Sequence, residues 1–178
     1  NLPLAQIAKL LHSSIHEERL CALLILVSQY QKADSQKQKQ IFNLYLKNYK
    51  YINNWDLVDL TAPRIVGAYL LDKPRDVLYK LARSHNLWKK RIAILATFQF
   101  IYHGESADTL KISRLLLHDN HDLIHKAVGW MLREVGKRCD EKILLDFLNR
   151  NHKVMPRTCL RYAIERLPEA KRKKYLYS

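Results

Sequence analysis

Glycine is scarce in this chain, and the motifs of several enzyme classes are absent. Only four of the 178 residues are glycine, and apolar side chains do not alternate with polar ones as they would in a half-buried strand. The sequence contains no glycine-rich phosphate-binding loop, no serine at a nucleophile elbow and no readable pairing of cysteine with histidine. Kinases, nucleoside triphosphatases and serine hydrolases are therefore excluded on motif grounds.

Cysteines are few and apolar runs are short. The three cysteines, Cys21, Cys139 and Cys159, have spacings that fit neither a disulfide framework nor a zinc site, which favours small core side chains in a reducing cytosol. The longest apolar run, 21–27, is far shorter than the roughly 20 residues that span a bilayer, and no signal peptide opens the chain. We expect a cytoplasmic protein without a membrane partner.

Positive charge is what the chain has in excess. Lysine and arginine outnumber aspartate and glutamate by 31 to 17, a net charge of +14. This excess favours binding to nucleic acid, because a cationic protein gains affinity by releasing counterions condensed on phosphates; an anionic membrane surface is the second candidate. The 48% hydrophobic content suffices for one domain over residues 1–178. Since the first residue is asparagine and not methionine, we expect the natural chain to begin earlier.

Apolar residues recur at intervals of three and four throughout, which predicts an all-α fold. N-caps at Asp34, Ser106, Asn120 and Asp140, a capping box of Ser14 with Glu17 and a stop at Gly104 agree with this pattern. The predicted helices cover residues 3–12, 16–32, 36–51, 54–60, 63–72, 75–84, 88–103, 107–117, 121–138, 141–150, 156–166 and 169–176.

Five similar segments recur along the chain. They begin with RLCALL at Arg19, WDLVDL at Trp55, RIAILA at Arg91, KAVGWM at Lys126 and RYAIER at Arg161, and successive starts are 36, 36, 35 and 35 residues apart. A fixed period near 35 with two helices per unit is typical of an α-solenoid of HEAT-like repeats, in which each pair buries its apolar face against its neighbours. Five such repeats fill the chain.

This register predicts which side chains share a surface. In a two-helix solenoid the second helices line the concave wall, so the five segment starts should face one groove. The positions one helical turn later lie on the same face; they are Leu23, Asp59, Leu95, Trp130 and Glu165. We therefore expect a basic concave face that also carries two tryptophans and an aspartate, a surface suited to a nucleic acid duplex.

The same residues also have ordinary structural explanations. Trp55 at helical spacing could belong to the core, and Asp59 stands just before Pro63, where it could cap the next helix. Arg91 could form a structural ion pair with Asp59, which would also keep the carboxylate ionised. The histidines of 118–125 have spacings that a metal could use, but no cysteine or firm carboxylate partner accompanies them, so we expect neither a metal nor another cofactor.

Four stretches in order resemble a known family. They are NNWDLVD from Asn53, LWKKRIAIL from Leu87, HKAVGWMLREVGKR from His125 and MPRTCLRYAIERL from Met155. Together they resemble the AlkD-like DNA alkylation repair glycosylases, which are HEAT-like repeat DNA glycosylases, over nearly the whole chain. Family members carry further helices before the point where this chain starts, including an aromatic residue near the lesion.

The resemblance implies a lesion-facing site made of Trp55, Asp59, Arg91 and Trp130. It also implies excision of alkylated bases from duplex DNA by cleavage of the N-glycosidic bond without base flipping. Glycosidases generally use two carboxyls for such a cationic transition state, and only one stands here. One is enough when the base is already cationic, as in N3- and N7-alkylated purines, because that base departs neutral without protonation.

In this interpretation Asp59, ionised beside Arg91, stabilises the cationic sugar and orients the attacking water, while Trp55 and Trp130 pack on the sugar. The residues expected to bind DNA phosphates are Arg19, Arg91, Lys126, Arg133 and Arg161. A monomer is expected, because one concave surface can hold a duplex.

Two alternatives stay open. The chain could be a non-catalytic HEAT-like scaffold that binds nucleic acid or an acidic protein, or a relative that binds branched or distorted DNA without cleaving it. A scaffold that only binds phosphates gains nothing from Asp59 in its cationic groove, because the acid repels the ligand. That argument favours the enzyme.

Overall fold

The protein is an all-α chain. A computed structural model describes residues 2–177, and no strand occurs among them. The helices are α1 (Leu4–Leu11), α2 (His16–Gln31), α3 (Ser35–Lys47), η1 (Tyr49–Tyr51), α4 (Trp55–Ala62), η2 (Pro63–Gly67), α5 (Asp76–Ala82), α6 (Leu87–Ala96), α7 (Phe98–Tyr102), α8 (Ala107–Leu116), α9 (Asp122–Arg138), α10 (Glu141–Asn151), α11 (Arg157–Ile164) and α12 (Glu169–Tyr177). None of the helices in this part of the chain is both long and apolar enough to cross a membrane.

The predicted helices are found close to their expected bounds, with three differences. The helix predicted over 36–51 ends at Lys47 and is followed by the 3₁₀ turn η1. The helix predicted over 88–103 is interrupted at Thr97, which separates α6 from α7. No break occurs before Pro63, where one helix was predicted to end and another to begin. Proline has no N–H to donate four residues back, and the chain continues directly from α4 into the wider π-helical turn of η2.

The observed helix caps agree in part with those predicted from the sequence. Asp34 and Asp140 accept backbone N–H bonds at the starts of α3 and α10, both at 2.8 Å, and Gly104 follows α7 with a φ of 77°. The capping box predicted for Ser14 with Glu17 is wrong, because α2 starts after Ile15 without a side-chain cap. The hydroxyl of Ser13 instead accepts the N–H of Ile15 at 3.0 Å. Ser106 precedes α8 but its side chain accepts no capping bond, and His121 caps α9 in place of Asn120.

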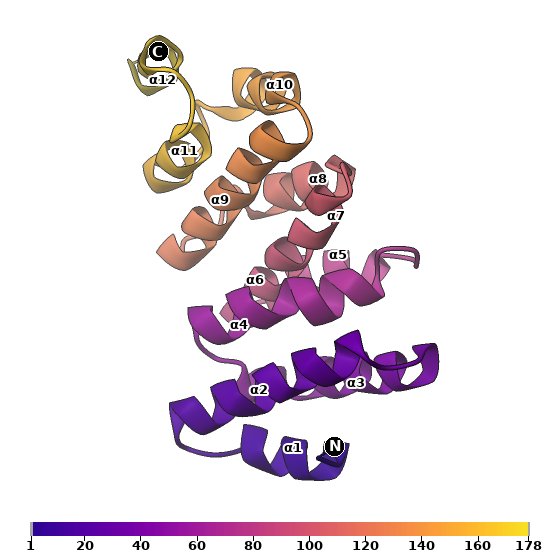
Figure 1. Ribbon diagram of the computed structural model, residues 1–178. Coiled ribbons are helices and arrows are strands. Elements are labelled where there is room, and N and C mark those ends of the chain that lie inside the picture. Colours follow the sequence, from indigo (N-terminus) through magenta and orange to yellow (C-terminus); the bar gives the residue numbers. More distant parts are fainter. Residues whose placement is uncertain (1, 178) are drawn as a thin grey trace.

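Helices pack in the order of the sequence, from α1 at one end of the molecule to α12 at the other (Figure 1). Five of them form a helix row in which α2 packs on α4, α4 on α6, α6 on α9, and α9 on α11. The other helices pack beside this row, including α1 and α3 on α2, α5 and α8 on α6, and α10 on α9. Each helix of the row carries one of the five predicted segment starts, so these starts, far apart in the sequence, lie on helices that pack on one another.

The core runs the length of the molecule. Buried apolar residues form one continuous cluster from Ile7 in α1 to Tyr175 in α12. Leu23 and Leu95 belong to it, and both are fully buried. The prediction that they face the groove is therefore wrong, because their apolar side chains are buried between neighbouring helices. Of the five positions one turn after the segment starts, those in α4 and α9 reach the site described next.

Candidate active site

A hollow of about 300 Å³ opens on the helix row. Its lining residues are Trp55, Asp59, Arg91, Leu123, Lys126, Trp130 and Tyr162. They come from α4, α6 and α9, with one residue from α11. We call this the tryptophan hollow. It contains the four residues predicted as a catalytic group together with the predicted phosphate ligand Lys126.

The helix α4 presents its two site residues on one face. Asn54 caps the helix, and its Oδ1 accepts the N–H of Trp55 at 2.8 Å. Leu57 and Val58 are fully buried, whereas Trp55 and Asp59, four residues apart and so on one face, line the hollow. Trp55 is 53% exposed, so the alternative that it is a core residue is wrong.

Asp59 is held by Arg91 and does not cap a helix. The Nε of Arg91 donates to Oδ1 of Asp59 at 2.8 Å, and its Nη2 donates to Oδ2 at 2.7 Å. The Nη1 of Arg91 also donates to the carbonyl oxygen of Leu123 at the start of α9. These bonds link α4, α6 and α9 through one guanidinium group and fix the direction of the carboxylate.

Burial sets the acidity of Asp59. Because the carboxyl group is largely removed from water, the pKa of Asp59 is raised above its ordinary value, and the charge of Asp56 adds to this effect. The hydrogen bonds and charge of Arg91 act in the opposite direction. The sequence predicted that Arg91 would keep the carboxylate ionised. The structure retains that interaction but adds a desolvation that outweighs it.

Trp130 and Asp59 also line a second hollow. This adjoining hollow, of about 550 Å³, is lined by both residues and by side chains of α4, η2 and α7 that include Arg64, Phe98 and Tyr102. The rings of Phe98 and Trp130 are tilted by 49° with their centroids 5.9 Å apart. Asp59 therefore borders two adjoining hollows.

Comparisons with known proteins show the family of this chain. Residues 2–167 match the model of a protein family described as DNA alkylation repair enzyme. This chain belongs to that family. A solved structure described as a predicted DNA alkylation repair enzyme from Enterococcus faecalis has the same fold, with a TM-score of 0.72 at 17% identity over 93% of this chain and 76% of that one. A comparison with curated protein sequences finds no significant match.

The cations predicted to bind phosphates have different surroundings in this DNA alkylation repair family member. Lys126 is half-buried in the hollow and pairs with Asp122 at 2.7 Å, one helical turn away. Arg161 is exposed on α11 and has no ion-pair partner in the part of the chain that the structure describes. Arg91 is only 4% exposed and is already bound, so we assign it to Asp59 and not to phosphate.

Arg19 and Arg133 lie outside the tryptophan hollow. The Nη1 of Arg19 donates to the carbonyl oxygens of Ser13 and Ser14, both at 3.0 Å, and thereby closes the turn between α1 and α2. Arg133 lies further along α9 and forms ion pairs with Glu165 and Glu134. The structure thus does not bring these two cations to the four central residues.

Tyr162 is a lining residue that the sequence did not predict. It directly follows the segment start Arg161. Because Gly129 has no side chain, α11 can approach α9 closely next to Tyr162. A Cβ at Gly129 would lie 2.4 Å from the carbonyl oxygen of Cys159 and 2.5 Å from Cβ of Tyr162. Gly67 has the same role between η2 and α6, where a Cβ would lie 2.2 Å from the carbonyl oxygen of Ala96.

Gly129→Ala should separate α9 from α11. The new methyl group meets a backbone carbonyl that cannot rotate away, so we expect a loss of about 1–3 kcal/mol in the free energy of unfolding, measured by chemical denaturation. Gly136→Ala on the same helix is the control, since a Cβ there meets only side-chain atoms of Leu144. Equal stability of the two variants would contradict the close approach.

Two histidines of the stretch 118–125 hydrogen-bond to the backbone around the start of α9. Among residues 2–177 no three His, Cys, Asp or Glu side chains are grouped as metal ligands. His121 instead caps α9, where its Nδ1 accepts the N–H of Leu123 at 3.2 Å, and Nε2 of His125 lies 2.5 Å from the carbonyl oxygen of Asp119.

Proposed function

We propose that this protein is a DNA glycosylase that excises cationic N3- and N7-alkylated purines from duplex DNA. Membership of the DNA alkylation repair enzyme family supports a DNA substrate. The observation that carries the proposal is the single carboxylate of the tryptophan hollow, which Arg91 holds and whose lining also includes Trp55 and Trp130. A surface that only binds phosphate has no use for a fixed negative charge at its centre.

The proposed reaction is hydrolysis of the N-glycosidic bond. The bond between C1′ and the base nitrogen breaks, and its electron pair stays on the base, which neutralises the positive charge of the alkylated ring. The oxygen of a water molecule bonds to C1′, and its proton passes to solvent. Because the base leaves neutral, no second carboxyl is needed to protonate it, unlike the two-carboxyl arrangement of most glycosidases.

Asp59 and the tryptophans act on the sugar in this proposal. The Asp59 carboxylate, directed by Arg91, stabilises positive charge as it develops at C1′ and orients the water. Trp55 and Trp130 present their rings to the cationic sugar, since the face of an indole attracts positive charge. The base remains in the stack, and the open sides of the hollow suit a duplex whose nucleotide is not flipped.

We also propose the arrangement that presents this site to DNA. The helix row would be the concave wall of a solenoid of about five HEAT-like repeats, in a single domain over residues 1–178 that acts as a monomer in the cytoplasm. The net charge of +14 supports binding along this wall.

Lys126→Gln tests the contact with the DNA backbone. Lys126 stands in the hollow, so loss of its charge should lower the slope of log K against log salt by about one unit, measured by fluorescence anisotropy with an unmodified duplex. Lys111→Gln, at an exposed position on α8 outside the hollows described above, is the matched control. A salt slope that falls equally in both variants would argue against a phosphate contact at Lys126.

The proposed activity is tested by base release. Methylated duplex DNA is incubated with the protein, and the released bases are separated by chromatography and identified. We expect 7-methylguanine or 3-methyladenine above the amount released without protein. Binding without any release would instead support a non-catalytic scaffold, and preferred binding of branched duplexes without release would support a protein that recognises distorted DNA.

A further inference from the structure

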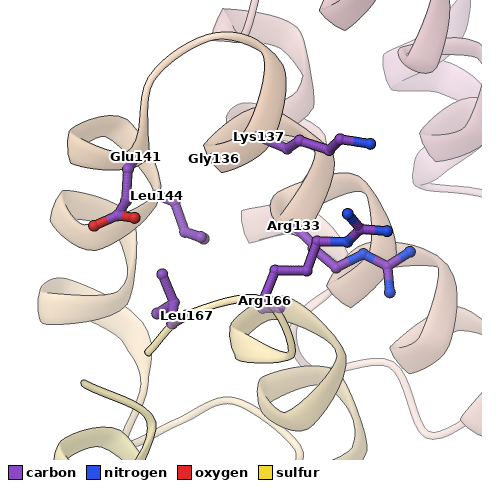
Figure 2. Close-up of a pocket in the computed structure, with 8 residues that line it drawn as sticks. Arg133, Gly136, Lys137, Glu141, Leu144, Arg166 and Leu167 are labelled. Atoms are coloured by element: carbon purple, nitrogen blue, oxygen red, sulfur yellow. The ribbon is translucent and has the colours of Figure 1, made fainter. Parts of the chain in front are cut away.

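A third hollow lies beyond the tryptophan hollow, between α9, α10 and the end of α11. It measures about 180 Å³, and its lining includes Arg133, Lys137 and Arg166 on one side and Glu141 and Leu144 on the other. The guanidinium groups of Arg133 and Arg166 and the amine of Lys137 are directed to the same side, away from Glu141 and Leu144 (Figure 2). We call this the cationic hollow.

The cationic hollow continues the face of α9 that forms the tryptophan hollow. Lys126, Trp130, Arg133 and Lys137 follow one another at intervals of four, three and four residues, which places them along one side of the helix. Arg166 follows Tyr162 by four residues, just past the end of α11. A ligand that lies over the tryptophan hollow can therefore extend along α9 to the three cations.

The charges in this hollow are incompletely matched. Lys137 and Arg166 are exposed, and neither has an ion-pair partner among residues 2–177. Arg133 is mostly buried, with 16% of its side chain exposed, and its Nε has no hydrogen-bond acceptor. A buried donor without an acceptor is unfavourable, so an oxyanion that reaches Arg133 would gain a charge-assisted hydrogen bond. Glu141 does not neutralise this group, because it pairs with Lys171.

We propose that the cationic hollow binds one backbone phosphate of the DNA strand whose damaged nucleotide lies in the tryptophan hollow. The inference rests on the proposed function. Trp130 and Lys137 are seven residues apart on α9, about 10 Å at the rise of an α-helix. We place α9 along the duplex, where nucleotides of one strand advance about 3.4 Å along the axis; in this placement the phosphate belongs about two or three nucleotides from the lesion. Two guanidinium groups and an amine suit a phosphate, whose oxygens can accept several bonds at once.

Glu165 occupies part of this site in the free protein. Its carboxylate accepts a hydrogen bond from Nη1 of Arg133, although the Glu165 side chain is 58% exposed. A phosphate in the hollow would replace this carboxylate as the partner of Arg133. Glu165→Gln removes the competing charge and should strengthen DNA binding.

The experiment tests whether one protein charge and one phosphate charge affect DNA binding through the same contact. The duplex carries a stable abasic analogue at its centre and a neutral methylphosphonate at a single position two or three nucleotides to either side. The Kd is measured by fluorescence anisotropy for the unaltered protein, for Arg166→Gln and for Lys137→Gln. Arg150→Gln, an exposed arginine of α10 outside the hollow, is the matched control. Thermal unfolding verifies that each variant is folded.

We expect one methylphosphonate position to weaken binding of the unaltered protein about fivefold. Arg166→Gln and Lys137→Gln should weaken binding of the ordinary duplex by a similar factor and should lose sensitivity to that position, while Arg150→Gln keeps it. Glu165→Gln should lower the Kd. The inference is overturned if the effects of the variant and of the methylphosphonate on the binding free energy are additive at every position. It is also overturned if inorganic phosphate saturates the hollow but no DNA position shows coupling to Arg166 or Lys137. Because the analogue has no base to release, this result does not depend on whether the protein is a glycosylase.

Discussion

Asp59→Asn should lower the rate of base release from methylated DNA by about 10²–10³-fold, the usual effect of removing one preorganised electrostatic group from an active site. Asparagine keeps the size of the side chain and can still accept a hydrogen bond from Arg91, so the geometry of the hollow should survive. What is lost is the negative charge opposite the developing cation at C1′. Affinity for the damaged duplex should stay equal or increase slightly, because the acid no longer repels the DNA phosphates.

Asp56→Asn is the matched control for this experiment. Asp56 lies in the same helix but is directed away from the hollow, to Nε2 of His16 at 2.7 Å. Its substitution should leave base release within a few-fold of the unaltered protein. An undiminished rate for Asp59→Asn would remove Asp59 from the catalytic role.

The pH dependence of base release is a second test of Asp59. Catalysis needs the ionised form of Asp59, so the rate should fall as the pH drops through its pKa. Because burial raises the pKa of Asp59, this loss should occur above the range of an exposed aspartate. The acidic limb should disappear from the residual activity of Asp59→Asn.

Arg91→Met should cost about 3–5 kcal/mol of unfolding free energy at neutral pH, measured by denaturant titration. The side chains of Arg91 and Asp59 are only 5% and 13% exposed, and removal of one partner leaves the other as a buried charge without compensation. The substitution also removes the bond to the carbonyl oxygen of Leu123, which ties α6 to α9. Catalysis should be lost as well, since nothing then directs the carboxylate.

The double variant Asp59→Asn, Arg91→Met separates charge from packing. With neither charge present, most of the lost stability should return, because a buried ion pair can often be replaced by neutral groups at little cost. A double variant no more stable than Arg91→Met alone would show that Arg91 stabilises the protein through its packing and its bond to Leu123, and not through Asp59.

The stability of Arg91→Met should fall as the pH rises. Without the cation, the pKa of Asp59 in the folded protein should rise further, while in the unfolded chain it stays at about 4. A folded pKa above the unfolded one means that the folded state binds more protons between the two values. Stability of the variant should therefore be highest in acid and fall as the pH rises from the unfolded pKa to the folded one.

The sequence predicted the helices and the central site because both depend on local spacing. Trp55 and Asp59 lie four residues apart, and the period near 35 residues relates them to Arg91 and Lys126 in the following helices. From that register we predicted that Trp55, Arg91 and Lys126 share one surface, and all three line the tryptophan hollow. It was insufficient at Leu23 and Leu95, where burial of an apolar side chain decides the direction it faces.

Other features depend on contacts between helices that no local pattern encodes. Tyr162 reaches the hollow because Gly129 allows α11 to lie close to α9, and a glycine within a helical pattern does not indicate which helix will approach it. Pro63 was predicted to separate two helices, yet α4 and η2 continue together because both pack on α6. The raised pKa of Asp59 depends on depth of burial, which the neighbouring residues in the sequence do not give.

The central claim is that a lone carboxylate suffices because the departing base is already cationic. The most direct measurement compares two otherwise identical duplexes, one with a single 7-methylguanine and one with a single hypoxanthine, a neutral purine lesion that must be protonated to leave easily. The account predicts that the protein accelerates release of 7-methylguanine and leaves hypoxanthine in place, and that Asp59→Asn lowers the accelerated rate by about 10²–10³-fold. Comparable release of hypoxanthine would contradict it, because a second acid would then have to act in the site.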